Sequence, residues 1–221
     1  MTINELQIKL SDSLKDYGWY PLLKSFILSD DFQQIIKTLY NQSQANEHFT
    51  PVIKDLFNMF KECKYSDLKV IIIDTEPNAT VNASTGLAWS TRINTPQTYT
   101  LFNTLDPKIT PINNLKHWAN QGVLLLNSSL TTTINKKHAH LELWKPFTGY
   151  LLEMLNTYNS GLIYVFVGEH TKQYHSLIST NNYKFFIPEL PDKIRDWNCK
   201  FVFDNINKLL FKQYGETISW T

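Results

Sequence analysis

The sequence predicts an α/β fold built on a central, mainly parallel sheet of four strands. Four short apolar runs, rich in β-branched and aromatic residues and bounded by polar residues, have the length of strands buried on both faces. Segments with helical spacing of apolar residues precede the first run, separate the second from the third and follow the fourth. With 221 residues, 43% of them hydrophobic, the chain can bury one substantial core, so we expect a single domain over residues 1–221.

The N-terminal part, residues 1–60, is expected to be helical. Leu, Phe and Ile recur at helical intervals between residues 12 and 42. The segment "SDDFQQIIKTLY" begins with Ser29 as a helix N-cap, and "TPVIKDLFNMF" repeats the pattern with Pro51 in its first turn.

The expected strands lie in the segments "DLKVIIID", "GVLLLNSS", "GLIYVFVG" and "YKFFIPEL", which occupy residues 67–74, 122–129, 161–168 and 183–190. An amphipathic helix over residues 140–159, with Pro146 near its start, joins the second strand to the third. A helix over residues 203–215 follows the fourth strand, and Gly215 closes it.

Charge and cysteine content exclude several classes of protein. The net charge of +1 does not require a polyanionic partner, although a local basic patch would be sufficient for one. Cys63 and Cys199 lie far apart and form no metal-binding spacing, which favours two reduced thiols in an intracellular protein. The N-terminus is not typical of a signal peptide, and no apolar run reaches the roughly 18 residues that a membrane span needs.

Polar loops follow all four expected strands. They read "DTEPNAT", "NSSLTTT", "GEHTKQ" and "PELPDKIRDW". Because ligands of parallel sheets bind beyond the carboxyl ends of the strands, we expect the functional site to lie where these loops converge.

At this point the sequence resembles the uracil-DNA glycosylases. "GVLLLNSSLTT" matches the family's G-V-L-L-L-N-x-x-L-T, and "LKHWANQ" precedes it as L-x-x-W-A-x-Q does there. "AHLELW" resembles S-H-x-x-x-G-W, one residue shorter, and "GLIYVFVGEHTKQ" resembles the strand that ends in W-G-x-x-A-x. The tail "FDNINKLLFKQYGETISW" resembles F-x-x-x-N-x-x-L with a terminal G-x-x-P-I-D-W. The resemblance covers about residues 50–221 and implies a three-layer sandwich. Residues 1–50 form a divergent helical part.

The first motif of the family is altered in this chain. The family carries G-Q-D-P-Y-H, six arbitrary residues and G-L-x-F-S, and here "DTEPNA", "TVNAST" and "GLAWS" align without a gap. The resemblance therefore implies that Glu76 takes the place of the catalytic aspartate, Thr75 that of the glutamine and Asn78 that of the tyrosine. Ala79 falls on the histidine of the motif. Asp74, in contrast, is expected to be a solvated loop carboxylate.

The resemblance also implies how a base would be held. A base in a duplex has to be flipped into a pocket before its glycosidic bond can be reached. Trp89 falls on the phenylalanine that stacks on uracil, and Ser90 beside it on a residue of the DNA-binding surface. Asn127 falls on the asparagine whose amide accepts from N3–H and donates to O4, which rejects cytosine. No metal or cofactor is needed.

The loop after the fourth strand departs most from the family, which carries H-P-S-P-L-S there. Aligned without a gap from Gly168, the histidine that donates to uracil O2 falls on Leu190, and the wedging leucine falls on Ile194. Lys193 and Arg195 then flank the wedge and are expected to contact DNA. A second alignment uses "HSLISTNNYKFF" and makes His175 the donor, so both alternatives stay open.

The loop "NKKHAH" carries His138 and His140, which are either solvated or in contact with a DNA phosphate. We take His140 as the candidate phosphate contact. The small Asn78 in place of a tyrosine predicts that thymine or a 5-substituted uracil could be admitted.

Two functions follow from the resemblance. The base-holding residues survive and the residues that serve bond cleavage are altered, which favours weak or redirected glycosidic hydrolysis in single-stranded or duplex DNA containing uracil or a modified uracil. The alternative is an inactive uracil-binding protein or a scaffold subunit of a replication or transcription assembly. The N-terminal helices would then be the surface for a protein partner.

Overall fold

A four-stranded parallel sheet forms the centre of the molecule. The computed structural model describes residues 2–191 and 197–221. The strand order is β3-β2-β5-β6, and every neighbouring pair is parallel. The strands are β2 (Val70–Asp74), β3 (Val123–Asn127), β5 (Ile163–Val167) and β6 (Tyr183–Ile187). This confirms the predicted sheet and each of its four strands.

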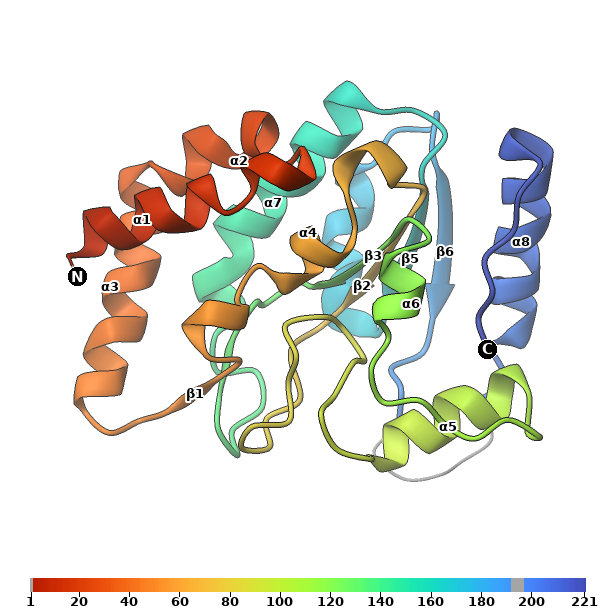
Figure 1. Cartoon of the computed structure of the whole chain (residues 1–221), viewed down its shortest axis with the longest axis horizontal. Coiled ribbons are helices and arrows are strands. Elements are labelled where there is room, and N and C mark those ends of the chain that lie inside the picture. Colours follow the sequence, from red (N-terminus) through yellow and green to blue (C-terminus); the bar gives the residue numbers. More distant parts are fainter. Residues whose placement is uncertain (1, 192–196) are drawn as a thin grey trace.

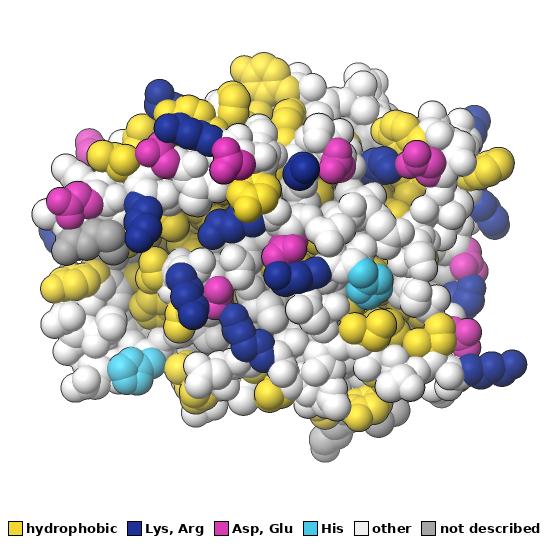
Figure 2. Space-filling model, in the orientation of Figure 1, with side chains coloured by type: hydrophobic (Ala, Val, Ile, Leu, Met, Phe, Trp, Pro, Cys, Tyr) yellow, Lys and Arg dark blue, Asp and Glu magenta, His cyan; other side chains and the backbone are white. Residues whose placement is uncertain are grey.

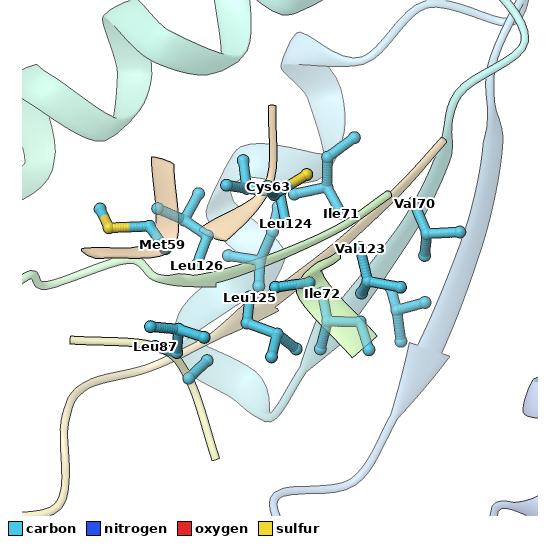
Figure 3. Close-up of a cluster of buried hydrophobic side chains, with 14 of the residues drawn as sticks. Met59, Cys63, Val70, Ile71, Ile72, Leu87, Val123, Leu124, Leu125 and Leu126 are labelled. Carbon is cyan, nitrogen blue, oxygen red and sulfur yellow. The ribbon is translucent and has the colours of Figure 1, made fainter. Parts of the chain in front are cut away.

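The strands form because their side chains are largely apolar on both faces. All five residues of β5, inside the sheet, and of β3, at one edge, are buried, whereas β6, at the other edge, is partly exposed. Figure 3 shows a buried cluster in which β2 and β3 pack against neighbouring segments. Strand β2 contributes Val70, Ile71 and Ile72, β3 contributes Val123, Leu124, Leu125 and Leu126, and the neighbouring segments contribute Met59, Cys63 and Leu87.

Helices cover the sheet on both sides, as the predicted three-layer sandwich requires. Figure 1 shows α1, α2, α3 and α7 on one side of the sheet and α8 on the other. The helices are α1 (Ile3–Asp12), α2 (Tyr20–Ile27), α3 (Asp30–Gln44), α4 (Asn58–Glu62), α5 (Pro96–Leu105), α6 (Lys116–Ala119), α7 (Leu141–Tyr158) and α8 (Lys200–Tyr214). Within the described residues, no helix combines the length and the apolar character that crossing a membrane requires.

Local sequence signals account for the helix ends. The Ser29 hydroxyl accepts from the backbone N–H of Phe32, so it caps α3 as expected. On α7 the buried residues Trp144, Phe147, Leu151 and Leu155 recur at helical spacing and face the core.

The expectation of a helix through residues 50–60 is wrong. Instead, β1 (Phe49–Thr50) pairs antiparallel with β4 (Thr132–Thr133), a 3₁₀ turn follows at Ile53–Asp55, and α4 begins only at Asn58. Thr50 precedes Pro51, and a following proline disfavours the helical conformation. Thr50 instead pairs with Thr132 of β4.

The topology brings four loops to one edge of the sheet. The carboxyl ends of the strands point toward the lower part of Figure 1, where the chain between β2 and α5 lies. Gly168, directly after β5, illustrates the convergence. A Cβ placed there would be 3.4 Å from Glu189 Cβ and 3.7 Å from Thr75 Oγ1, which belong to the loops after β6 and β2.

Candidate functional site

A pocket of about 460 Å³ opens at the carboxyl edge of the sheet. Its wall includes Asp74, Thr75, Glu76, Trp89, Glu189 and Leu190. Asp74 ends β2, and the other five residues come from the loop between β2 and α5 and from the loop after β6. Further wall residues come from the start of α5 and from the turn after β4. The pocket therefore lies at the predicted edge of the sheet. Of the four polar loops, those after β2 and β6 line it, whereas "NSSLTTT" and "GEHTKQ" contribute no residue to the described wall.

Trp89 supplies a flat, half-buried aromatic surface in this wall. Its ring packs edge-on against Trp118 and Trp197, with centroids 6.4 and 5.9 Å away and interplanar angles of 78° and 88°. Its backbone has a φ of +61°, which is rare for a bulky residue and costs on the order of 1–3 kcal/mol. The surrounding structure therefore holds the indole in place against a local conformational cost.

The turn that carries Trp89 depends on Gly86. Gly86 has a φ of +86°, and a Cβ there would lie 2.0 Å from the backbone oxygen of Asp55. The backbone N–H of Ala88 donates to the carbonyl of Leu125 in β3, at 3.0 Å. A glycine without a side chain and one hydrogen bond to the sheet thus fix the turn beneath the indole.

Asn127 ends β3 next to Asp74, which lines the pocket, although Asn127 itself is not one of the wall residues. It is 4% exposed, and its Oδ1 has no hydrogen-bond partner among the described residues. It pairs in register with Asp74, and register partners on adjacent strands project toward the same face of a sheet. Because buried amide oxygens are almost always satisfied, this unpartnered atom suits a ligand.

Glu76 is the wall carboxylate nearest to a histidine. Its side chain is 10% exposed. Its Oε2 accepts the backbone N–H of His138 at 2.7 Å, and its Oε1 lies 3.9 Å from His138 Nε2. His138 has a φ of +61° and packs its ring against that of His170, with centroids 4.4 Å apart. From the sequence, His138 was considered only as a solvated residue or a phosphate contact, so its contact with Glu76 was not foreseen.

Asp74 does not have the solvated environment that was expected for it. It is the last residue of β2, and its side chain keeps only a small surface toward the pocket. Burial raises its pKa to about 7, and the neighbouring Glu189 and Glu76 act in the same direction. The backbone N–H of Thr75, at 2.8 Å from Oδ1, and the adjacent Trp89 side chain oppose this shift. Trp89 Nε1 nevertheless forms no hydrogen bond of normal geometry.

Three further candidates also line the pocket. Thr75 is buried, and its Oγ1 has no hydrogen-bond partner among the described residues. Asn78 uses its Oδ1 to accept the Thr80 N–H at 2.9 Å. Ser90 is 2% exposed, and its hydroxyl accepts the backbone N–H of Leu115. Base binding by Thr75 and Asn78 and a DNA contact of Ser90 stay predictions.

The two alternatives for the leaving-group donor lie in different places. Leu190 lies in the pocket wall. His175 is exposed on the 3₁₀ segment Glu169–Leu177, with its ring 5.8 Å from that of Phe166. Strand β6 lies between this segment and Leu190, as the gapless alignment requires.

A phosphate contact by His140 stays a prediction, and in the structure its ring is engaged by other side chains of the protein. Its side chain is 6% exposed, and both ring nitrogens have partners. Nδ1 lies 2.8 Å from Thr131 Oγ1, whereas Nε2 lies 2.9 Å from Gln42 Oε1 and 3.2 Å from Thr133 Oγ1. Burial lowers the pKa of this imidazole, and its hydrogen bonds join the segment around Thr131 to α3.

The remaining predicted DNA contacts, Lys193, Ile194 and Arg195, lie outside the described residues. On the face that Figure 2 shows, cationic and anionic side chains are interspersed instead of being separated into one basic patch. Arg92 lies in the loop between β2 and α5 and is engaged by the carboxylate of Asp55, in the 3₁₀ turn Ile53–Asp55, at 2.6 Å.

The described part of the chain contains no group of three or more His, Cys, Asp or Glu side chains that could hold a metal ion. Cys63 and Cys199 are free and buried.

Comparisons with known proteins agree on one family. A model of the Uracil DNA glycosylase superfamily matches residues 60–212. The chain is 29% identical to the uracil-DNA glycosylase of Vibrio cholerae serotype O1 over 224 aligned residues, which cover 96% of this chain and 97% of that protein. It is 30% identical to the uracil-DNA glycosylase of Proteus mirabilis over 216 residues, covering 91% of this chain and 95% of that protein.

A solved structure agrees as well. The crystal structure of mimivirus uracil-DNA glycosylase superimposes with a TM-score of 0.82 at 21% identity and covers 94% of this chain and 88% of that one. The alignment with the Vibrio protein spans 96% of the chain. Similarity therefore extends further toward the N-terminus than the motifs over residues 50–221 indicate.

Proposed function

The chain belongs to the uracil DNA glycosylase superfamily, and from this membership we propose that it binds DNA and holds a flipped uracil, or a 5-substituted uracil, in the pocket at the carboxyl edge of the sheet. The observation that carries the proposal is the joint placement of an aromatic platform and an unpartnered amide. Trp89 lines the pocket, and Asn127 projects beside Asp74, which lines it too.

Each of these groups has a role that its surroundings support. Stacking on an aromatic ring is worth roughly 1–3 kcal/mol per base, and Trp89 is held for it at a conformational cost. The Asn127 amide can accept from N3–H and donate to O4 of uracil. A cytosine would present its amine to the amide donor, so the site distinguishes the two pyrimidines.

Glu76 is the group that we assign to hydrolysis. Cleavage of the glycosidic bond develops positive charge on the sugar, which a nearby carboxylate stabilises. The N–H of His138 holds one Glu76 oxygen, and this leaves the other oxygen, beside the His138 ring, to orient and deprotonate a water molecule. A glutamate reaches one methylene further than the family's aspartate, and a displacement of about 1 Å can cost about 100-fold in rate.

Hydrolysis is therefore proposed to be slower than in relatives with the unaltered motifs, or directed to another base. Leu190 contributes an apolar side chain to the wall at the position of the donor histidine. Asn78, shorter than a tyrosine, leaves room for a substituent on C5 of the base.

The same apolar Leu190 supports a second candidate, a protein that reads uracil in DNA without cleaving it. Both candidates need the base-holding groups, but only the hydrolase needs Glu76. Substitutions at these positions therefore separate them.

The test uses a single-stranded oligonucleotide with one uracil, followed by alkali to reveal abasic sites, together with filter binding. For the hydrolase we expect cleavage that falls by at least about 100-fold in Glu76→Gln, because the carboxylate is lost while the side-chain shape is kept. Glu142→Gln, at a side chain that is 85% exposed on α7, is the matched control and should cleave like the wild type.

Asn127→Ala is the test of base holding. Asn127 Oδ1 has no partner in the described part of the chain, so the substitution breaks no hydrogen bond of that oxygen within the protein. A loss of binding would therefore be due to the lost contact with the base. We expect the uracil preference in binding to fall about tenfold or more. Uracil-dependent binding without cleavage would assign the reader role. Equal binding of uracil-containing and uracil-free DNA, with no cleavage, would refute the proposed function.

A further inference from the structure

A carboxyl group lies on the floor of the pocket where a strand residue meets the platform. Asp74 ends β2, lines the pocket, and pairs in register with Asn127. The Trp89 indole lies beside it. Asp74 is thus a neighbour of both groups that we propose to hold the base.

The charges around Asp74 oppose its ionisation. Glu189 faces it from the loop after β6, and Glu76 faces it from its own loop. Lys137 lines the same pocket from the turn after β4, and His138 lies behind Glu76. Burial is the largest effect, and together with the two carboxylates it raises the pKa of Asp74 to about 7.

The position of Asp74 beside Asn127 suggests the atom that it would reach. On a uracil ring the edge that carries N3–H has O4 on one side and O2 on the other. An amide that donates to O4 and accepts from N3–H leaves O2 free, on the side of the amide oxygen. A donor on that side would meet O2, and this is the side on which we place Asp74.

We propose that neutral Asp74 is the hydrogen-bond donor to the O2 carbonyl of the bound base. It would supply the leaving-group stabilisation that Leu190, at the family's histidine position, cannot supply. This inference rests on the proposed function of the pocket. The Thr75 N–H engages Oδ1, so Oδ2 carries the proton that is donated.

The reaction balances with two carboxyl groups in opposite protonation states. The bond between the sugar C1′ and the base N1 breaks, and its electron pair goes to the base, where the charge is shared with O2. Asp74 gives its proton to O2, water adds to C1′, and Glu76 accepts a proton from that water. Exchange with solvent then reprotonates Asp74 and deprotonates Glu76. Two carboxyl groups with different surroundings commonly divide acid and base roles in this way.

An ionised Asp74 would act in the opposite sense. Its negative charge would repel O2 and the anionic leaving group, so the pocket would lose affinity for the base as pH rises. If only the neutral form binds, affinity falls about tenfold for each pH unit above the midpoint.

The test measures the preference for uracil over adenine, which has no O2, by filter binding between about pH 5.5 and 8.5 at constant salt. The uracil nucleotide carries a 2′-fluorine, which disfavours the sugar cation and keeps the bond intact. Wild-type preference should decline above about pH 7. Asp74→Asn keeps a donor without titrating, so its preference should stay level and exceed that of the wild type at the highest pH.

Glu189→Gln provides a second variant at an exposed residue, where folding is not at risk. Removal of its negative charge should move the wild-type midpoint to lower pH. Glu142→Gln should reproduce the wild-type profile. A uracil preference that is independent of pH and unchanged in Asp74→Asn would overturn the role of Asp74 while leaving the proposed function intact. No uracil preference at any pH would overturn both.

Discussion

Asp74 links the acid–base chemistry of the pocket to the stability of the chain. A carboxyl group that is neutral when folded and ionised when unfolded makes the folding free energy depend on pH. The pKa of Asp74 is about 7 in the folded chain, against an ordinary value of 3.8. Its stabilising contribution is therefore complete below its unfolded value and is lost as pH rises through about 7.

Asp74→Asn should accordingly be more stable than the wild type at high pH. We expect a gain on the order of 2 kcal/mol in the free energy of unfolding at about pH 8, because a buried charge is removed, and a smaller gain at about pH 5. Urea denaturation followed by circular dichroism measures both values. A difference that is the same at the two pH values would show that Asp74 does not titrate between them.

At the residue scale, motif matching pointed to pocket residues that belong to a motif, and it missed pocket residues that only the folded chain brings to the same place. Trp89, Thr75, Glu76 and Asn78 line the pocket, as the gapless alignment of one loop predicts. Asp74 was misjudged because Asp74 and Glu76, two residues apart, look alike in sequence, and only the structure shows that Asp74 is the last residue of β2 with a largely buried carboxyl group.

The histidines show the same limit. His138 and His140 are two residues apart, and the turn between β4 and α7 decides which one meets Glu76. The backbone of that turn has positive φ values at Asn135 and His138, and the sequence does not predict this conformation at either residue.

At the scale of elements, the segment that carries Trp89 shows how a tight turn positions a functional side chain. Gly86 lets the backbone pass against the carbonyl of Asp55, and the Ala88 N–H attaches the turn to β3. A side chain at position 86 would push the turn away from the sheet and move the indole with it.

Gly86→Ala should therefore destabilise the chain by roughly 2–4 kcal/mol and weaken the uracil preference, because the new Cβ collides with backbone at a positive φ. Gly149→Ala is the matched control. Gly149 lies inside α7 with no atom within 4 Å of an added Cβ, so the same change should stabilise by about 0.5–1 kcal/mol. Chemical denaturation of both variants checks the contrast, and similar losses in the two would contradict the steric argument.

Periodicity predicted the elements whose side chains are uniformly buried or strongly amphipathic. Strands β2, β3 and β5 and helices α3, α7 and α8 belong to this group, and β6 was found by its aromatic and apolar run although it is partly exposed. The pair β1 and β4 was not foreseen, because each has two residues and is stabilised by a partner more than 80 positions away. The chain around Pro51 became a turn for the same tertiary reason.

At the scale of the whole molecule, the C-terminal tail connects the far side of the sheet to the pocket. The Asn207 side chain in α8 exchanges two hydrogen bonds with the backbone of Ile218, both 2.9 Å long. The carbonyl of Trp220 accepts from Trp118 Nε1 at 3.1 Å, and the two rings pack with centroids 4.9 Å apart. Trp118 in turn supports Trp89.

Trp220→Ala should cost about 3 kcal/mol of stability, because a side chain that is 7% exposed would leave a cavity beneath Trp118. Phe211→Ala removes an aromatic ring from the exposed face of α8, where 64% of the residue is accessible, and should cost less than about 0.5 kcal/mol. Thermal denaturation distinguishes the two. Equal losses would mean that the tail does not brace the core.

The indole contacts of Trp89 also give the protein an optical signal of its own. Four of the six tryptophans form a connected group, in which Trp89 contacts Trp118 and Trp197, and Trp118 contacts Trp220. Excitation energy moves readily between indoles at such separations, so a base that stacks on Trp89 would quench the emission of its neighbours too. Occupancy of the pocket can thus be followed by intrinsic fluorescence, without a label on either the protein or the nucleic acid.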